Sequence, residues 1–317
     1  MENMFLKKGT FSSVLKYEIF KKFKYKTKDI DKFNNKLYVL KITNNEDNNR
    51  ELNILKKIRE IQNNNKYFLT IESEIYELKN NEEIVKYMRD LFNQKLITNS
   101  IYNKSNIYYF IKDGGDLELF DSFIKISNKD LNIWTNNTYE KLKIFISNIL
   151  EAINFLHINN ICHFDIKPEN IISNNNTICK NKINFKLIDF GFSEEYPFTN
   201  YLKKSQGTPE YFPKYIRGVE YNEFLPIIYT NDWSTNYNHI SVKTNDFKLL
   251  YKTDIYSFGR TLYYLNKLLE SYNLFDESKI LFLTNQMTNS NIYERYNIDD
   301  CINYDLNIYP NPNPNPK

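Results

Sequence analysis

The sequence predicts an α+β fold of two lobes: a β-rich N-terminal lobe with one main helix, and a mostly helical C-terminal lobe. Runs rich in aromatic and aliphatic residues at 6–20 and 36–42 indicate strands near the start of the chain. Further on, 141–160 and 253–270 have the apolar spacing of long helices. The pattern changes near Lys112–Asp116, and 317 residues are enough for two lobes.

The main helix of the first lobe is predicted at 46–62, where apolar side chains recur at helical spacing. These side chains are Leu52, Leu55, Ile58 and Ile61. Residues 66–112 alternate aromatic or aliphatic residues with polar ones, and they end in the strand-like run IYYFIK. The segment 66–106 is longer than this region of the lobe requires, and its role is open.

Composition and charge argue against several classes of protein. The 42 basic and 39 acidic residues nearly balance, to a net charge of +3, whereas nucleic-acid binders are usually strongly basic. No apolar run approaches the roughly 18 residues of a membrane-spanning helix, and the first residues lack the apolar segment of a secretory signal. The three Cys lack the spacing of a metal site. We therefore expect a cytoplasmic, monomeric protein with reduced thiols and no nucleic-acid or membrane partner.

A compositional bias points to the genome of origin. Ala occurs once, at Ala152, while Asn, Ile, Lys and Tyr are abundant, as an AT-rich genome would impose. A protozoan, an endosymbiont or a large DNA virus fits this bias, and a viral protein would act in the host cytoplasm or the virion. The tail 306–317, which ends in PNPNPNPK, is expected to be a flexible extended end.

Two segments carry the strongest functional signal. HFDIKPEN (163–170) follows the predicted helix that ends near 160, and KLIDFGFS (186–193) follows further on. Together they resemble the catalytic loop and the metal-binding D-F-G segment of the eukaryotic protein kinase family. The resemblance implies a protein-kinase-like fold in one domain, 1–305, with an N-lobe at 1–112 and a C-lobe at 113–305.

The resemblance assigns four residues to the chemistry of phosphoryl transfer. Asp165 matches the carboxylate that orients the acceptor hydroxyl and accepts its proton. Lys167 matches the cation that offsets charge on the transferred phosphate. Asn170 and Asp189 match the two side chains that hold Mg²⁺, which prefers oxygen ligands.

The resemblance also implies an ATP site, formed in part by the Gly-rich loop in LKKGTFSSV (6–14). Gly9 occupies the central glycine position and Val14 the residue that packs on adenine. Lys7 and Ser12 replace the first and third glycines, so the loop should be stiffer and more crowded than usual.

Lys41 matches the lysine that binds the α- and β-phosphates. Its partner should be a Glu on the following helix, and Glu51 fits the family pattern better than Glu60, the alternative.

The adenine contacts are expected in IYYFIKDGGDLELF (107–120), which resembles the hinge between the lobes. With the alignment set by the two glycines at 114–115, Tyr109 lies near the gatekeeper position, where its size would narrow the back pocket. Residues from Phe110 to Lys112 would then offer backbone N–H and C=O groups to adenine.

The segment GTPEYFP (207–213) resembles the end of the activation segment, and Thr208 together with Lys167 is the pattern of Ser/Thr kinases. Tyr215 replaces the Glu that usually follows. In the family that Glu pairs with an Arg, recognisable here as Arg295, so Arg295 needs another partner, for which Glu220 is a candidate. Residues 222–247 are interpreted as an insertion, a surface loop or a binding element.

Two further positions concern the catalytic loop itself. Asp254 would bond the backbone near His163 and fix the geometry of the loop. Phe164 stands where the family commonly has an Arg that pairs with an activation-loop phosphate. The absence of that Arg suggests an enzyme that is competent without such phosphorylation.

The sequence thus predicts an ATP- and Mg²⁺-dependent Ser/Thr protein kinase that acts on protein substrates. The alternative is a pseudokinase, a nucleotide-binding scaffold or regulatory module on the same fold. The altered Gly-rich loop, the missing Glu and Phe164 support the alternative. The presence of Lys41, Asp165, Asn170 and Asp189 favours the enzyme.

Overall fold

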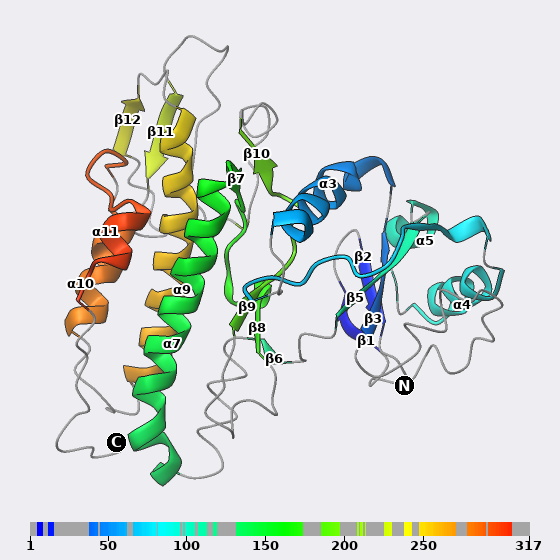
Figure 1. Ribbon diagram of the computed structural model, residues 1–317, viewed down its shortest axis with the longest axis horizontal. Helices are drawn as coiled ribbons and strands as arrows, with labels where there is room; N and C mark the ends of the chain where they lie inside the picture. Colours follow the sequence, from blue (N-terminus) through cyan, green and yellow to red (C-terminus); the bar gives the residue numbers. More distant parts are fainter. Residues whose placement is uncertain are drawn as a thin grey trace. The chain divides into compact units, whose positions relative to one another are not determined.

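The computed structural model divides the chain into two compact units, which are described separately (Figure 1). The first unit contains 1–65 and 69–114, and the second contains 66–68 and 115–317. The structure describes residues 5–8, 12–15, 38–43, 45–61, 66–80, 82–95, 97, 99–104, 107–112, 117–118, 131–173, 185–196, 208, 210–211, 213, 225–229, 238–242, 247–270, 278–289 and 291–305.

The first unit is built on an antiparallel sheet of five strands in the order β1-β2-β3-β5-β4. The strands are β1 (Phe5–Lys8), β2 (Ser12–Leu15), β3 (Tyr38–Thr43), β4 (Tyr76–Glu77) and β5 (Ile107–Lys112). The centre of the sheet is the β3–β5 pair, in which Leu40 lies opposite Phe110 and Lys41 opposite Tyr109. Leu40, Phe110 and Tyr109 are fully buried, so this pair anchors the core of the unit.

Helix α3 (Asn45–Ile61) follows β3 directly, in agreement with the helix predicted at 46–62. Leu52, Leu55 and Ile58 bury one stripe of the helix, as their spacing predicted. Ile61, at the last residue of the helix, is 42% exposed and lies outside that stripe.

The structure corrects the reading of 66–106, because the alternating pattern did not reveal two helices there. These are α4 (Glu82–Asn93) and α5 (Asn99–Lys104), preceded by the 3-10 turn η2 (Leu78–Asn80). Ile84, Met88 and Leu91 of α4 are buried in the same core cluster as Leu40 and Phe110. The segment therefore adds a helical layer to the core of the first unit.

The second unit is mostly helical, as predicted. Its helices are α7 (Leu131–Ile158), α9 (Lys252–Glu270), α10 (Ser278–Met287) and α11 (Ile298–Ile302), with 3-10 turns η3 (Pro168–Asn170) and η5 (Phe247–Tyr251). Helix α7 begins ten residues before the predicted 141, whereas α9 matches its predicted range. Helix α10 packs beside α9 (Figure 1). Helix α11 contacts α7.

Short strands hold the segments that carry the sequence motifs. Three of them form the sheet β6-β8-β9, with β6 at Leu117–Glu118, β8 at Ile171–Ser173 and β9 at Phe185–Leu187. Strand β7 (Ile161–Cys162) pairs with β10 (Glu194–Glu195). These pairings fix both ends of the two motifs, since β7 and β8 flank 163–170 and β9 and β10 flank 188–193.

The predicted insertion at 222–247 contains an antiparallel ribbon of β11 (Leu225–Tyr229) and β12 (Asn238–Val242). The tail 306–317 and the flexibility predicted for it lie outside the described residues.

The predicted α+β class is confirmed: the N-terminal part is built on strands and the C-terminal part is mostly helical. Among the residues that the structure describes, no helix combines the length and the apolar character needed to cross a bilayer.

Candidate active site

The structure brings Lys41 and Glu51 together within the first unit. The Lys41 ammonium donates to the Glu51 carboxylate, and both residues are buried, at 7% and 3% exposure. Glu60, the alternative partner, is exposed on α3. The short span between the end of β3 and the second turn of α3 makes this contact possible although only ten residues separate the pair.

The expected Gly-rich loop joins β1 to β2, where Lys7 lies opposite Val14. Val14 is half-buried. Gly9 lies outside the described residues, and of Lys7 the structure describes only the backbone. The strand pairing therefore places Lys7 and Val14 side by side at the base of the predicted loop.

The predicted adenine contact at Phe110 is at odds with the hydrogen bonds of β5. The Phe110 N–H donates to Ser73 Oγ at 2.9 Å, and the Phe110 carbonyl accepts the Glu72 N–H at 2.9 Å. Strand β5 also continues through Lys112, which lies opposite Tyr38. Strand β5 therefore ends at Lys112, the residue at which the sequence analysis ended the N-lobe.

The catalytic-loop residues converge on Asp165 in the second unit. Asn170 Nδ2 donates to the Asp165 carbonyl at 2.8 Å and to Asp165 Oδ2 at 2.9 Å. Lys167 Nζ lies 2.9 Å from the same carboxylate oxygen. Asp165 and Asn170 are buried, whereas Lys167 is half-buried. The loop thus holds a carboxylate, a cation and an amide in one network.

Thr208 closes this network from a segment far along the chain. Its N–H and its hydroxyl donate to Asp165 Oδ1 at 3.0 and 2.8 Å. The hydroxyl oxygen also accepts from Lys167 Nζ at 2.6 Å. The sequence indicated Thr208 as part of a Ser/Thr pattern, but its contact with Asp165 depends on the tertiary fold. Both oxygens of the carboxylate are thereby oriented.

Asp189 lies beside this network through the backbone. The Ile188 N–H donates to the Asn170 carbonyl at 2.9 Å. Asp189, the next residue after Ile188, therefore lies close to the end of the catalytic loop. Asp189 is exposed and has φ 67°, a left-handed conformation that costs free energy in a non-glycine residue. The next residue, Phe190, is buried and its ring contacts the His163 ring at 5.0 Å between centroids.

Asp254 fixes the catalytic loop from beneath, as the sequence predicted. Its Oδ2 accepts the His163 N–H and its Oδ1 accepts the Phe164 N–H, both at 2.8 Å. His157 Nε2 lies 3.1 Å from Oδ2. Burial alone would raise the pKa of Asp254, yet the hydrogen bonds from His157 and from the His163 backbone lower it. These bonds hold Phe164 at φ 61°, a second left-handed residue in the site.

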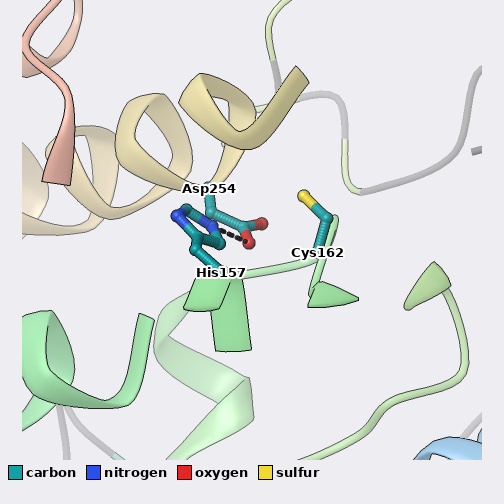
Figure 2. A group of neighbouring side chains, drawn as sticks. All are labelled: His157, Cys162 and Asp254. Atoms are coloured by element: carbon teal, nitrogen blue, oxygen red, sulfur yellow. Dashed lines mark hydrogen bonds and ion pairs between the residues drawn. The ribbon is translucent and has the colours of Figure 1, made fainter. Parts of the chain in front are cut away.

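Cys162 completes a cluster with His157 and Asp254, whose side chains point toward one another from α7, β7 and α9 (Figure 2). Their donor atoms lie within 4.8 Å of one another, a separation compatible with a metal ion. However, both Asp254 oxygens already accept N–H groups of the loop. Burial raises the pKa of the Cys162 thiol, so it acts as a small buried apolar residue.

His163 is held as a neutral ring. Its Nε2 donates to the Ile188 carbonyl at 3.2 Å, while Nδ1 accepts the Asp165 N–H at 3.3 Å. Complete burial lowers its pKa. The ring thus connects the two motifs, through Ile188 on one side and Asp165 on the other.

Arg295 is buried, and backbone carbonyls and an aromatic ring contact its guanidinium. Its guanidinium donates to the Asn289 carbonyl at 3.0 and 3.1 Å and to the Lys252 carbonyl at 3.0 Å. The Tyr256 ring lies 4.8 Å from it, a cation–π contact. The candidate partner Glu220 lies outside the described residues.

Asn170 and Asp189 offer suitable oxygen donors for a magnesium ion. Because Asn170 Nδ2 donates to Asp165, the amide oxygen is the atom that can bind a cation. Asp189 supplies a carboxylate on an exposed turn. A carboxylate and an amide oxygen, completed by phosphate oxygens and water, match the preference of Mg²⁺. The residues therefore fit the metal that the sequence predicted.

Comparison with known proteins finds one matching family model and several relatives. Residues 27–225, more than half of the chain, match the family model described as protein kinase domain. Death-associated protein kinase 2 of Mus musculus is 33% identical over 141 residues, which is 44% of this chain and 35% of that protein.

Two other relatives match 145 and 87 residues of the chain. Calcium-dependent protein kinase 4 of Plasmodium falciparum is 31% identical over 145 residues, covering 44% of this chain and 25% of that protein. The liver/testis isoform of the phosphorylase b kinase gamma catalytic chain of Rattus norvegicus is 37% identical over 87 residues, covering 27% and 20%. The chain thus spans about a third or less of the length of these curated relatives.

Proposed function

Because the chain belongs to the protein kinase family, we propose that it transfers the γ-phosphate of ATP to Ser or Thr hydroxyls of protein substrates. The observation that carries the proposal is the network around Asp165. One carboxylate is oriented there by Thr208, Lys167 and Asn170 at 2.8–3.0 Å. Phosphoryl transfer depends mostly on such positioning and on electrostatic stabilisation.

Asp165 positions the acceptor hydroxyl and accepts its proton, and Lys167 offsets the charge of the transferred phosphate. Thr208 fixes the two side chains relative to each other, since its hydroxyl bonds to both of them. Asn170 and Asp189 hold Mg²⁺, which neutralises charge on the nucleotide phosphates when it is bound.

The nucleotide is bound by residues of the first unit. Lys41, oriented by Glu51, binds the α- and β-phosphates. Lys7, Gly9 and Val14 belong to the loop that covers the nucleotide. The backbone of the segment that begins at Lys112 binds adenine, because the N–H and C=O groups of Phe110 are already bonded within the first unit.

We further propose that the enzyme acts as a cytoplasmic monomer and is competent without phosphorylation of its activation segment. Phe164 is fully buried, and its N–H is bonded to Asp254, so the left-handed turn of the loop is held by the fold itself. Phosphatase treatment should leave the activity unchanged. A loss of activity after that treatment would remove this part of the proposal.

The proposal is tested with Asp165→Asn, a near-isosteric change that removes the carboxylate charge. Transfer of labelled phosphate from ATP to a Ser/Thr peptide should fall by at least a hundredfold, the size of a lost general base. ATP affinity, measured by calorimetry, should change less than threefold, because Lys41 and Glu51 are untouched. Asp299→Asn, at an exposed position of α11, is the matched control.

Wild-type protein that binds ATP but transfers no phosphate to any protein or peptide would instead support the scaffold alternative. Equal turnover by wild type and Asp165→Asn would contradict the role given to Asp165.

A further inference from the structure

Arg260 lies on α9 with its guanidinium fixed in one orientation. Its Nε donates to the Glu210 carbonyl at 3.2 Å, and its Nη2 donates to the Tyr264 hydroxyl at 3.0 Å. The guanidinium also lies over the Tyr263 and Tyr264 rings, 5.4 and 5.1 Å from their centroids. Two aromatic faces and two hydrogen bonds therefore hold this cation in place.

The cation is partly exposed, and its Nε–H···O bond to Glu210 lies in an exposed setting. Within the part of the chain that the structure describes, no carboxylate lies at ion-pair distance from Arg260. Arginine presents five N–H donors in a rigid fork that suits carboxylates and phosphates. Two of the five are used in the bonds to Glu210 and Tyr264, so donors remain for an external anion.

The position of Arg260 relative to Asp165 follows from hydrogen bonds within the second unit. Thr208 donates to Asp165, and Glu210, two residues further on, accepts from Arg260. At about 3.3–3.6 Å per extended residue, the guanidinium lies within roughly 15 Å of the Asp165 carboxylate. An extended substrate covers that distance in about four residues.

Tyr211 connects the surroundings of Arg260 with those of Asp165. It is buried, and its ring packs against Tyr264 at 5.4 Å, while its N–H donates to the Thr208 carbonyl at 3.0 Å. The segment that orients Asp165 is thus the same segment that seats Arg260. A substrate chain bound along this segment would meet both groups.

We propose that Arg260 is a specificity-determining residue that binds an acidic or phosphorylated side chain of the substrate, within about four residues of the acceptor Ser or Thr. The inference rests on the proposed protein kinase activity and adds the substrate class. Glu169 and Glu210 act in the opposite sense: burial raises the pKa of Tyr211 most, and the negative charges of these two nearby carboxylates raise it further. The competing outcome is therefore a preference for basic peptides.

The test compares peptides that differ at one position only. Glu, Gln or Lys is placed at each of the four positions before and after a fixed acceptor, and kcat/KM is measured for each peptide. At one or more positions, wild type should prefer Glu to Gln by about three- to tenfold, the value of a charge-assisted hydrogen bond in a partly exposed site.

Three variants separate recognition from structure. Arg260→Gln should reduce the Glu/Gln ratio to about one, Arg260→Lys should keep part of it, and Arg260→Glu should reverse it in favour of the Lys peptide. A purely structural role would lower kcat/KM for all peptides and leave these ratios unchanged. Lys267→Gln, at an exposed position of the same helix, is the control that should leave the ratios as in wild type.

The possible failures are distinguishable. If wild type phosphorylates the neutral peptide but shows no preference for Glu at any position, or prefers Lys, the inference is wrong and the proposed kinase activity stands. The same holds if Arg260→Gln keeps the preference for Glu. If wild type phosphorylates none of the peptides, the proposed function fails, and the inference fails with it.

Discussion

Asp254→Asn is the substitution that tests the scaffold of the catalytic loop. The carboxylate accepts the N–H groups of His163 and Phe164 on separate oxygens, each at 2.8 Å, and is fully buried. Asparagine has one side-chain oxygen, so one of these N–H groups would face an amide NH₂. A buried donor without an acceptor costs about 1–3 kcal/mol, and the other bonds lose their charge assistance.

The expected loss in free energy of unfolding is therefore about 3–5 kcal/mol, of a total that is typically 5–15 kcal/mol. Urea unfolding followed by tryptophan fluorescence measures it, and phosphate transfer should fall as well, because the left-handed turn at Phe164 loses its support. Asp299→Asn, the exposed control, should change stability by less than about 1 kcal/mol. If Asp254→Asn matches wild type within that margin, the scaffold role assigned to Asp254 is refuted.

Three further substitutions and conditions have defined outcomes. Gly259→Ala should destabilise by about 1–3 kcal/mol in urea unfolding, because the added methyl would lie 2.8 Å from Met287 Cβ; a stabilised variant would contradict the packing of α9 on α10. Glu51→Gln should lower the free energy of unfolding by about 3 kcal/mol, since it breaks a buried ion pair, whereas Glu60→Gln should lower it by less than about 0.5 kcal/mol. Similar losses for the two variants would reject the assignment of Glu51 as the partner of Lys41. The free energy of unfolding should decrease as the pH is lowered below 6.5, because burial lowers the pKa of His163 in the folded protein. A protonated Nδ1 would then face the Asp165 N–H, which is itself a donor. His163→Gln should flatten that slope, and an unchanged slope would assign it to other groups.

Local patterns predicted the elements whose spacing is regular. The strand 36–42 and the helix 46–62 appear nearly as expected, because most of their apolar residues are buried on a regular spacing. The bonds from Asp254 to the catalytic loop were also predicted and are confirmed.

The errors have identifiable causes. Helix α4 carries Ile84, Met88 and Leu91 at helical spacing, a signal that was present in the sequence but hidden by the surrounding alternation of aromatic and polar residues. The adenine contact expected at Phe110 took no account of tertiary hydrogen bonds, which join its N–H to Ser73 Oγ and its carbonyl to the Glu72 N–H.

Other features could not have been predicted from the sequence. Thr208 meets Asp165 across 43 positions, and Arg295 is satisfied by backbone carbonyls that no residue pattern reveals. Arg260 likewise gains its orientation from Glu210, which lies 50 positions away. Such contacts depend on tertiary packing, and local propensity does not report them.

The most direct test of the central claim is the mass of a Ser/Thr peptide after incubation with the protein, ATP and Mg²⁺. The account predicts that wild type adds one phosphate to the acceptor hydroxyl and that Asp165→Asn and Asp189→Asn, although folded, add none at the same time point. Equal phosphorylation by wild type and both variants would contradict the claim that these carboxylates carry the transfer.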